Sequence, residues 1–93
     1  MSRDQKIRQP MVAGMFYPQK KQTLEREIAM LLENATDKHI SGNVVSLIVP
    51  HAGYLYSGGV AARAYRQIMD VNIDIVVVIS PSHREYFKEV SIY

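Results

Sequence analysis

The sequence predicts an α/β fold with a partial parallel or mixed sheet, and three observations predict it. Two apolar runs, residues 44–49 (VVSLIV) and 73–79 (IDIVVVI), have the length and the Val and Ile content of buried strands. A helical pattern lies between them. Strand, helix and strand in this order are typical of a βαβ unit, in which the two strands run parallel.

Two helices are expected. The first follows a short segment bounded by Pro10 and Pro18, and its apolar stripe recurs at helical spacing. That stripe consists of Leu24, Ile28, Leu31, Leu32 and Ala35. A polar loop, residues 34–43, leads from it to the first run. We place the second helix at about residues 58–69, with Ser57 as its N-cap. Its expected packing face is Val60, Ala61, Ala64, Tyr65 and Ile68.

The expected sheet is incomplete. Continuous apolar strands are buried on both faces, which requires helices on both sides of the sheet, and two helices are few for that. Val90 and Ile92 alternate like the start of a further strand. We therefore interpret residues 1–93 as the N-terminal portion of a single larger α/β domain, or as a protomer of a homo-oligomer that completes its sheet with a partner.

Composition excludes several classes. The 11 Lys and Arg residues nearly balance 9 Asp and Glu residues and form no dense basic stripe, so we expect no nucleic-acid partner. The absence of cysteine excludes disulfides and thiolate ligands within the chain. No apolar run reaches the length of a signal core or a membrane span, so we expect a cytoplasmic protein without membrane contact.

Two histidines are the strongest chemical signal. His51 and His83 each lie just past the end of an apolar run, so parallel strands would bring both imidazoles to one sheet edge, where α/β folds bind ligands. Imidazole is a common ligand of iron, copper and zinc, although a catalytic site normally takes a third protein ligand. Glu85 is a weaker candidate for that ligand. The alternative is that both histidines are loop residues satisfied by backbone hydrogen bonds.

A second candidate site is the segment around the start of the second helix. Glycines and a serine at a helix N-terminus expose amides that favour an anion or a substrate carboxylate. The residues concerned are Tyr54, Ser57, Gly58 and Gly59. No lysine precedes the serine, so a nucleotide-binding P-loop is not supported. The alternative is structural, with the serine as a cap and the glycines permitting close packing.

At these residues the sequence resembles the Memo family. The resemblance rests on several motifs in the family's order, and it covers most of the chain. The motifs are residues 50–54 (PHAGY), 56–58 (YSG), 61–62 (AA) and 80–83 (SPSH), preceded by residues 12–18 (VAGMFYP) with Leu24 after them.

The resemblance implies a fold related to class III extradiol, non-haem iron dioxygenases. It also implies that His51 and His83 are metal ligands, with iron or copper as the cofactor, and that the remaining ligands lie beyond Tyr93. Microbial members of the family often occur beside a radical-SAM protein, which is the partner that the resemblance implies, and their reaction is not established. The ligand, a small molecule or a peptide, is not identified.

Two functions of different classes follow. The first is a metal-dependent redox domain of oxidoreductase or dioxygenase type, in which Tyr54 and residues 57–59 help to shape the substrate pocket. The second is a metal-free module that binds an anion or a phosphopeptide at residues 57–59. A third interpretation is an inactive truncated fragment.

Overall fold

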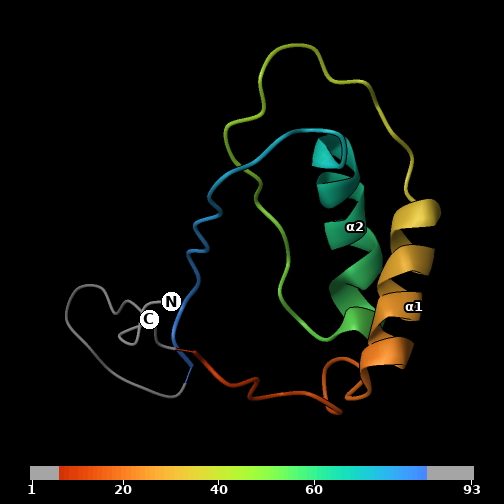
Figure 1. Cartoon of the computed structure of the whole chain (residues 1–93), viewed down its shortest axis with the longest axis vertical. Coiled ribbons are helices and arrows are strands. Elements are labelled where there is room, and N and C mark those ends of the chain that lie inside the picture. Colours follow the sequence, from red (N-terminus) through yellow and green to blue (C-terminus); the bar gives the residue numbers. More distant parts are fainter. Residues whose placement is uncertain (1–6, 84–93) are drawn as a thin grey trace. The chain divides into compact units, whose positions relative to one another are not determined.

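The structure is a computed structural model that describes residues 7–83, and it is helical. It divides into two compact units (Figure 1). One unit is Met11–Val71 and contains every helix of the described residues. The described part of the other unit, residues 7–10 and 72–83, has no regular secondary structure. None of the described helices is long and apolar enough to cross a membrane.

Helix α1, Lys21–Glu33, confirms the first predicted helix. Its sequence, KQTLEREIAMLLE, consists mostly of residues with high helix propensity. The amide of Asn34 closes the helix by donating to the carbonyl of Met30 at 3.0 Å. Leu24, Leu31 and Leu32 are half-buried on the predicted stripe, and Ala35, just past the helix, is buried. The apolar spacing therefore identified the face that packs.

The second helix is shorter and more irregular than predicted. A π-helical turn, η1 (Tyr54–Gly58), leads into α2 (Gly59–Tyr65), and a 3-10 turn, η2 (Arg66–Ile68), ends the element. Ser57 lies inside the π-helical turn and is not an N-cap, so that prediction is wrong. The buried residue of α2 is Ala62, whereas Val60 and Tyr65 of the expected face are exposed.

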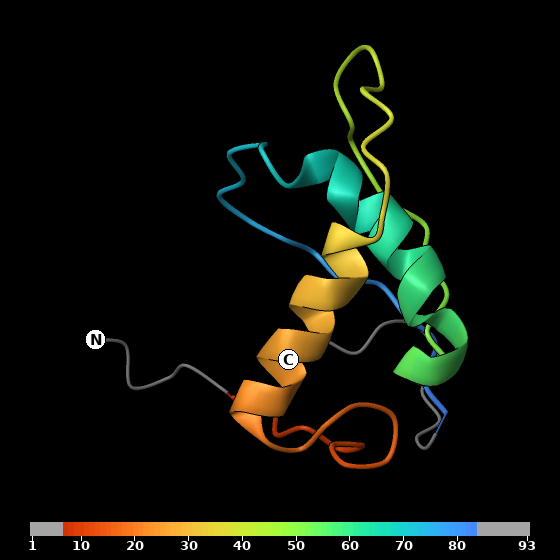
Figure 2. The same ribbon diagram turned by 90° about the vertical axis from the view of Figure 1, so that its right-hand side faces the viewer.

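Helices α1 and α2 pack against each other, as Figures 1 and 2 both show. Small residues allow their close approach. A Cβ on Gly58 would lie 3.1 Å from Cδ1 of Leu31 on α1, tighter than an ordinary van der Waals contact. The buried side chains of the described residues are Ala35, Ala62 and Ser57, so this unit has a small core.

The predicted sheet is absent from the described residues, and the α/β prediction with its βαβ unit is wrong for this chain. Residues 44–49 and 73–79 form no strand; the β-structure described is an isolated bridge between Ala13 and Tyr17. Val45 is 94% exposed, Ile48 98% and Ile79 92%. The apolar runs indicate residues that favour burial, but a strand also requires a hydrogen-bonded neighbour and cover on its faces, which a local pattern cannot supply.

The expected further strand at Val90 and Ile92, and the candidate ligand Glu85, lie outside the described residues. Within the Met11–Val71 unit, the chain from α1 to η1 instead runs as a long extended connection, seen in yellow and green in Figure 1. This connection carries His51 to the start of η1.

Candidate functional site

His51 lies on a turn, residues 50–53, whose hydrogen bonds come from the π-helical turn that follows it. The hydroxyl of Ser57 donates to the carbonyl of Ala52 at 2.8 Å and lies 3.4 Å from that of Gly53. The amides of Tyr56 and Ser57 both donate to the carbonyl of Gly53, at 2.9 and 3.0 Å. Ser57 is 6% exposed, so its hydroxyl acts as a buried support beneath the histidine turn.

A second support comes from the N-terminal motif, residues 12–18. This motif folds into a tight turn in which the amide of Gly14 donates to the carbonyl of Tyr17 at 2.7 Å. Gly14 has a φ of +83°, a conformation that favours glycine. The amide of Tyr54 donates to the carbonyl of Phe16 at 2.8 Å, and a Cβ on Gly53 would lie 3.4 Å from that same oxygen. The N-terminal motif and the histidine turn therefore contact each other through their backbones.

Tyr54 joins these two motifs through its side chain as well. Its ring lies 5.5 Å from that of Tyr17, centre to centre, with the planes tilted by 38°. Burial raises the pKa of the Tyr54 phenol above its ordinary value, and the neighbouring Tyr17, Glu27 and Tyr65 raise it further. Tyr54 is therefore a neutral, half-buried phenol that packs in the unit three residues after His51.

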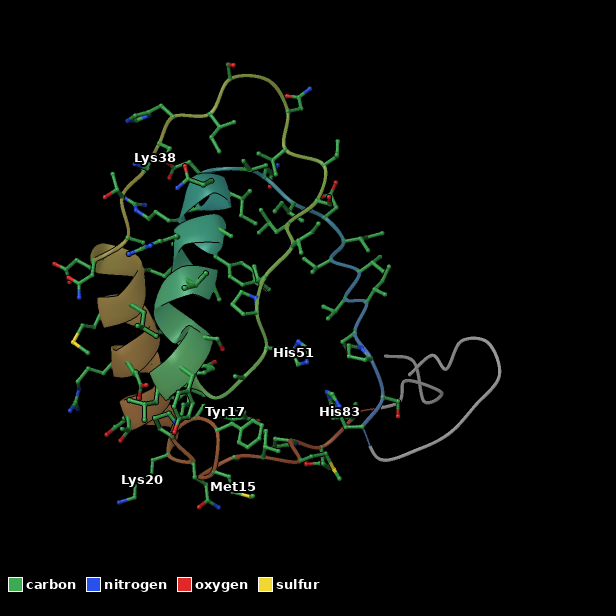
Figure 3. The ribbon with its side chains drawn as sticks, turned by 180° about the vertical axis from the view of Figure 1, so that it is seen from behind. Met15, Tyr17, Lys20, Lys38, His51 and His83 are labelled. Atoms are coloured by element: carbon green, nitrogen blue, oxygen red, sulfur yellow. The ribbon has the colours of Figure 1, made fainter. Side chains whose placement is uncertain are left out.

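The two predicted metal ligands lie in different compact units of the structure. His51 belongs to the Met11–Val71 unit and His83 to the other unit, and both are exposed (Figure 3). No group of three or more His, Cys, Asp or Glu residues that could hold a metal ion occurs among residues 7–83. The parallel strands expected to bring the two imidazoles to one sheet edge do not form among residues 7–83.

The predicted anion segment is largely engaged in the fold. Ser57 and Gly58 are buried, and the Ser57 hydroxyl and amide already donate to backbone carbonyls. Gly59 is exposed, with open space where a Cβ would lie. The third histidine, His39, is exposed; its amide donates to Asp37 Oδ1 at 2.9 Å, and its Nδ1 lies 3.8 Å from Oδ2.

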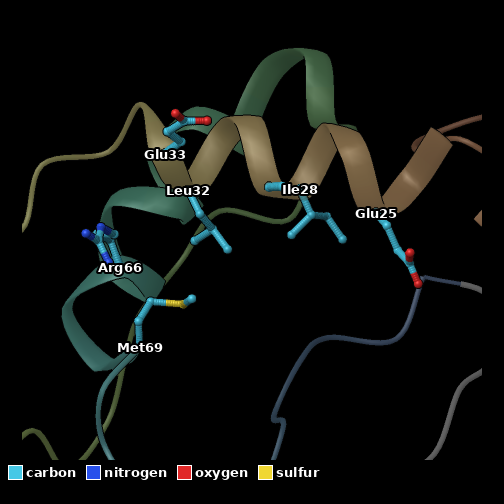
Figure 4. Close-up of a pocket in the computed structure, with 7 residues that line it drawn as sticks. Glu25, Ile28, Leu32, Glu33, Arg66 and Met69 are labelled. Carbon is cyan, nitrogen blue, oxygen red and sulfur yellow. The ribbon is translucent and has the colours of Figure 1, made fainter. Parts of the chain in front are cut away.

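Two hollows in the Met11–Val71 unit were missed by the sequence reasoning. An open apolar groove of about 530 Å³ lies between α1 and the end of η2 (Figure 4). It is lined by Glu25, Ile28, Ala29, Leu32, Glu33, Arg66 and Met69. A smaller polar pocket of about 280 Å³ lies near the carboxyl end of α2. Both form between segments far apart in the chain, so no local sequence signal marks them.

The Met11–Val71 unit is thus a small helical unit that presents the exposed His51 on the turn before η1. The chain belongs to the Memo-like protein family, whose family model matches residues 8–93. This finding confirms the resemblance seen in the sequence motifs.

Curated relatives give the same assignment. The chain is 39% identical over 88 residues to a MEMO1 family protein of Thermoplasma acidophilum, an alignment that covers 92% of this chain and 31% of the relative. It is 37% identical to a MEMO1 family protein of Nitrosopumilus maritimus, covering 91% and 32%. For a MEMO1 family protein of Aquifex aeolicus the identity is 35%, covering 95% and 32%. The chain thus spans about a third of the length of these relatives. No solved structure matches it significantly.

Proposed function

We propose that this Memo-family chain supplies His51 and His83 as ligands to an iron or copper ion in a redox-type domain. The observation that carries the proposal is the presentation of His51. Its imidazole is exposed, whereas the turn beneath it is held by the buried Ser57 hydroxyl and by contact with the N-terminal motif. A histidine whose backbone is already held by neighbouring groups loses less conformational entropy when its imidazole binds a metal.

The π-helical turn directly after His51 also supports the proposal. Such turns are rare in proteins, and those that occur are frequently found at functional sites. Here the turn lets one carbonyl, that of Gly53, accept from two successive amides. The irregular geometry thus ends the histidine turn and begins α2.

The two imidazoles are of the donor type that iron and copper prefer, but two protein ligands are fewer than such a site normally has. Imidazole nitrogen suits iron and copper, and two imidazoles with one carboxylate form a known iron site. The remaining ligand would come from outside the 93 residues, consistent with relatives that are about three times as long. When bound, the metal would supply redox chemistry; Tyr54 would line the adjoining ligand pocket, and Ser57 and Gly58 would position the turn.

A copper titration by calorimetry tests the proposal. We expect one saturable site in the native chain and loss of that site in both His51→Ala and His83→Ala. His39→Ala is the matched control, since it removes an exposed imidazole outside the Memo motifs and should leave binding unchanged. Saturable binding that survives both the His51 and the His83 substitutions would exclude the proposal.

A further inference from the structure

The polar pocket near the end of α2 has an unusual lining. Its lining residues are Asn34, Thr36, Lys38, Arg63 and Gln67. All five side chains are polar, and the two that carry charge are both cations. None of them belongs to the histidine turn or to the predicted anion segment, so the pocket is a separate feature of the Met11–Val71 unit.

One side chain, that of Gln67, builds this pocket. Its Nε2 donates to the carbonyl of Thr36 at 2.8 Å and to that of Arg63 at 3.0 Å. Its Oε1 accepts from the amide of Lys38 at 2.8 Å. The Gln67 amide thus fastens the loop after α1 to the end of α2 across about thirty residues of sequence. Lys38 and Arg63 are consequently held beside one pocket by backbone contacts, and their own charged groups are not used for this.

The two cations also lack compensating charge. In the described part of the chain neither Lys38 nor Arg63 has an ion-pair partner; the ion pairs there are Lys21 with Glu25 and His39 with Asp37. Asp37 is turned to the amide of His39 at 2.9 Å and does not line the pocket. Two like charges held beside one hollow without a carboxylate attract an anion.

We propose that this pocket binds a small oxyanion, of which phosphate is the type. The planar guanidinium of Arg63 can donate two parallel hydrogen bonds to such a group, and the Lys38 ammonium adds a second charge. Thr36 and Asn34 line the same pocket, and their side chains carry a hydroxyl and an amide that can donate further hydrogen bonds. A volume of about 280 Å³ has room for a phosphate group and part of an attached organic substituent.

The test is a titration of the ¹⁵N-labelled chain with inorganic phosphate, followed by amide chemical shifts, with sodium chloride holding the ionic strength constant. We expect saturable shifts at the amides of Lys38 and Gln67. Arg63→Gln and Lys38→Gln should each raise the dissociation constant by about threefold or more, because each removes one exposed charge contact. Arg26→Gln, the same change at an exposed arginine of α1, is the matched control and should leave the constant unchanged.

A second titration, with glycerol phosphate, distinguishes a phosphate group attached to an organic ligand from free inorganic phosphate. Tighter binding of the monoester would identify a phosphorylated organic ligand, and tighter binding of inorganic phosphate would identify the free anion; both results support the site. Shifts that do not saturate, or that change equally in Arg26→Gln and Arg63→Gln, would overturn it. Because His51 is not part of this pocket, His51→Ala should bind phosphate like the native chain whatever the outcome for metal.

Discussion

The hydroxyl of Ser57 is the contact on which the fixed position of the histidine turn depends most directly, and Ser57→Ala tests that dependence. The substitution removes the 2.8 Å hydrogen bond to the carbonyl of Ala52 from a side chain that is 6% exposed. A neutral hydrogen bond of this kind contributes about 1 kcal/mol. Alanine returns up to about 0.5 kcal/mol through its higher helix propensity. The expected net loss is therefore about 0.5 to 1 kcal/mol in the free energy of unfolding of the Met11–Val71 unit.

Urea denaturation followed by far-ultraviolet circular dichroism measures this loss, and amide exchange locates it. Ser46→Ala is the matched control, because Ser46 is an exposed residue of the connection and its substitution should change stability by less than about 0.5 kcal/mol. Ser57→Ala should also speed the exchange of the Tyr54 amide, which donates to Phe16 in the native turn. If Ser57→Ala matched Ser46→Ala in both stability and Tyr54 exchange, the argument that Ser57 holds the turn would be refuted.

Three further predictions concern the same unit. Gly59→Ala should stabilise α2 by about 0.5 to 1 kcal/mol in urea denaturation, because the added Cβ meets open space. Gly58→Ala should gain little stability, because its Cβ would lie 3.1 Å from Leu31. Equal effects of the two substitutions would contradict this packing. The Tyr54 phenol should ionise above pH 10.0, which the 295 nm absorbance difference between the native chain and Tyr54→Phe measures. The stability that the neutral phenol contributes is present below pH 10.0 and is lost as the pH rises through the raised pKa. Ionisation at or below pH 10.0 would contradict the prediction. Gln67→Ala should cost about 1 kcal/mol and speed exchange of the Lys38 amide, and an unchanged exchange rate would show that Gln67 does not hold the loop.

Local patterns predicted the helices better than the sheet. The stripe from Leu24 to Leu32 identified α1, because helix formation depends on residues three and four apart. Residues 73–79 carry an equally clear apolar pattern, yet they remain exposed because a strand needs a partner that the pattern does not contain. The motifs identified the family correctly, since family membership depends on residue types and their order and does not require the sheet.

In the candidate site too, sequence predicted features set by local residue order and missed contacts between distant segments. Sequence placed His51 just past the end of an expected strand; residues 44–49 form no strand, and His51 instead ends the extended connection that leads to η1. It misassigned Ser57, because a serine near a helix start can bond forward to an amide as a cap or back to a carbonyl, as it does here to Ala52. It missed Gln67, whose partners lie 29 and 31 residues away and leave no local signal.

The central proposal is that the two Memo-motif histidines bind one metal ion, and electron paramagnetic resonance of the copper-loaded chain tests it most directly. The hyperfine splitting reports how many imidazole nitrogens coordinate the copper. We expect two coordinated imidazole nitrogens in the native chain and in His39→Ala, and loss of the two-nitrogen signal in His51→Ala and in His83→Ala. Two nitrogens retained in either of those last two variants would contradict it.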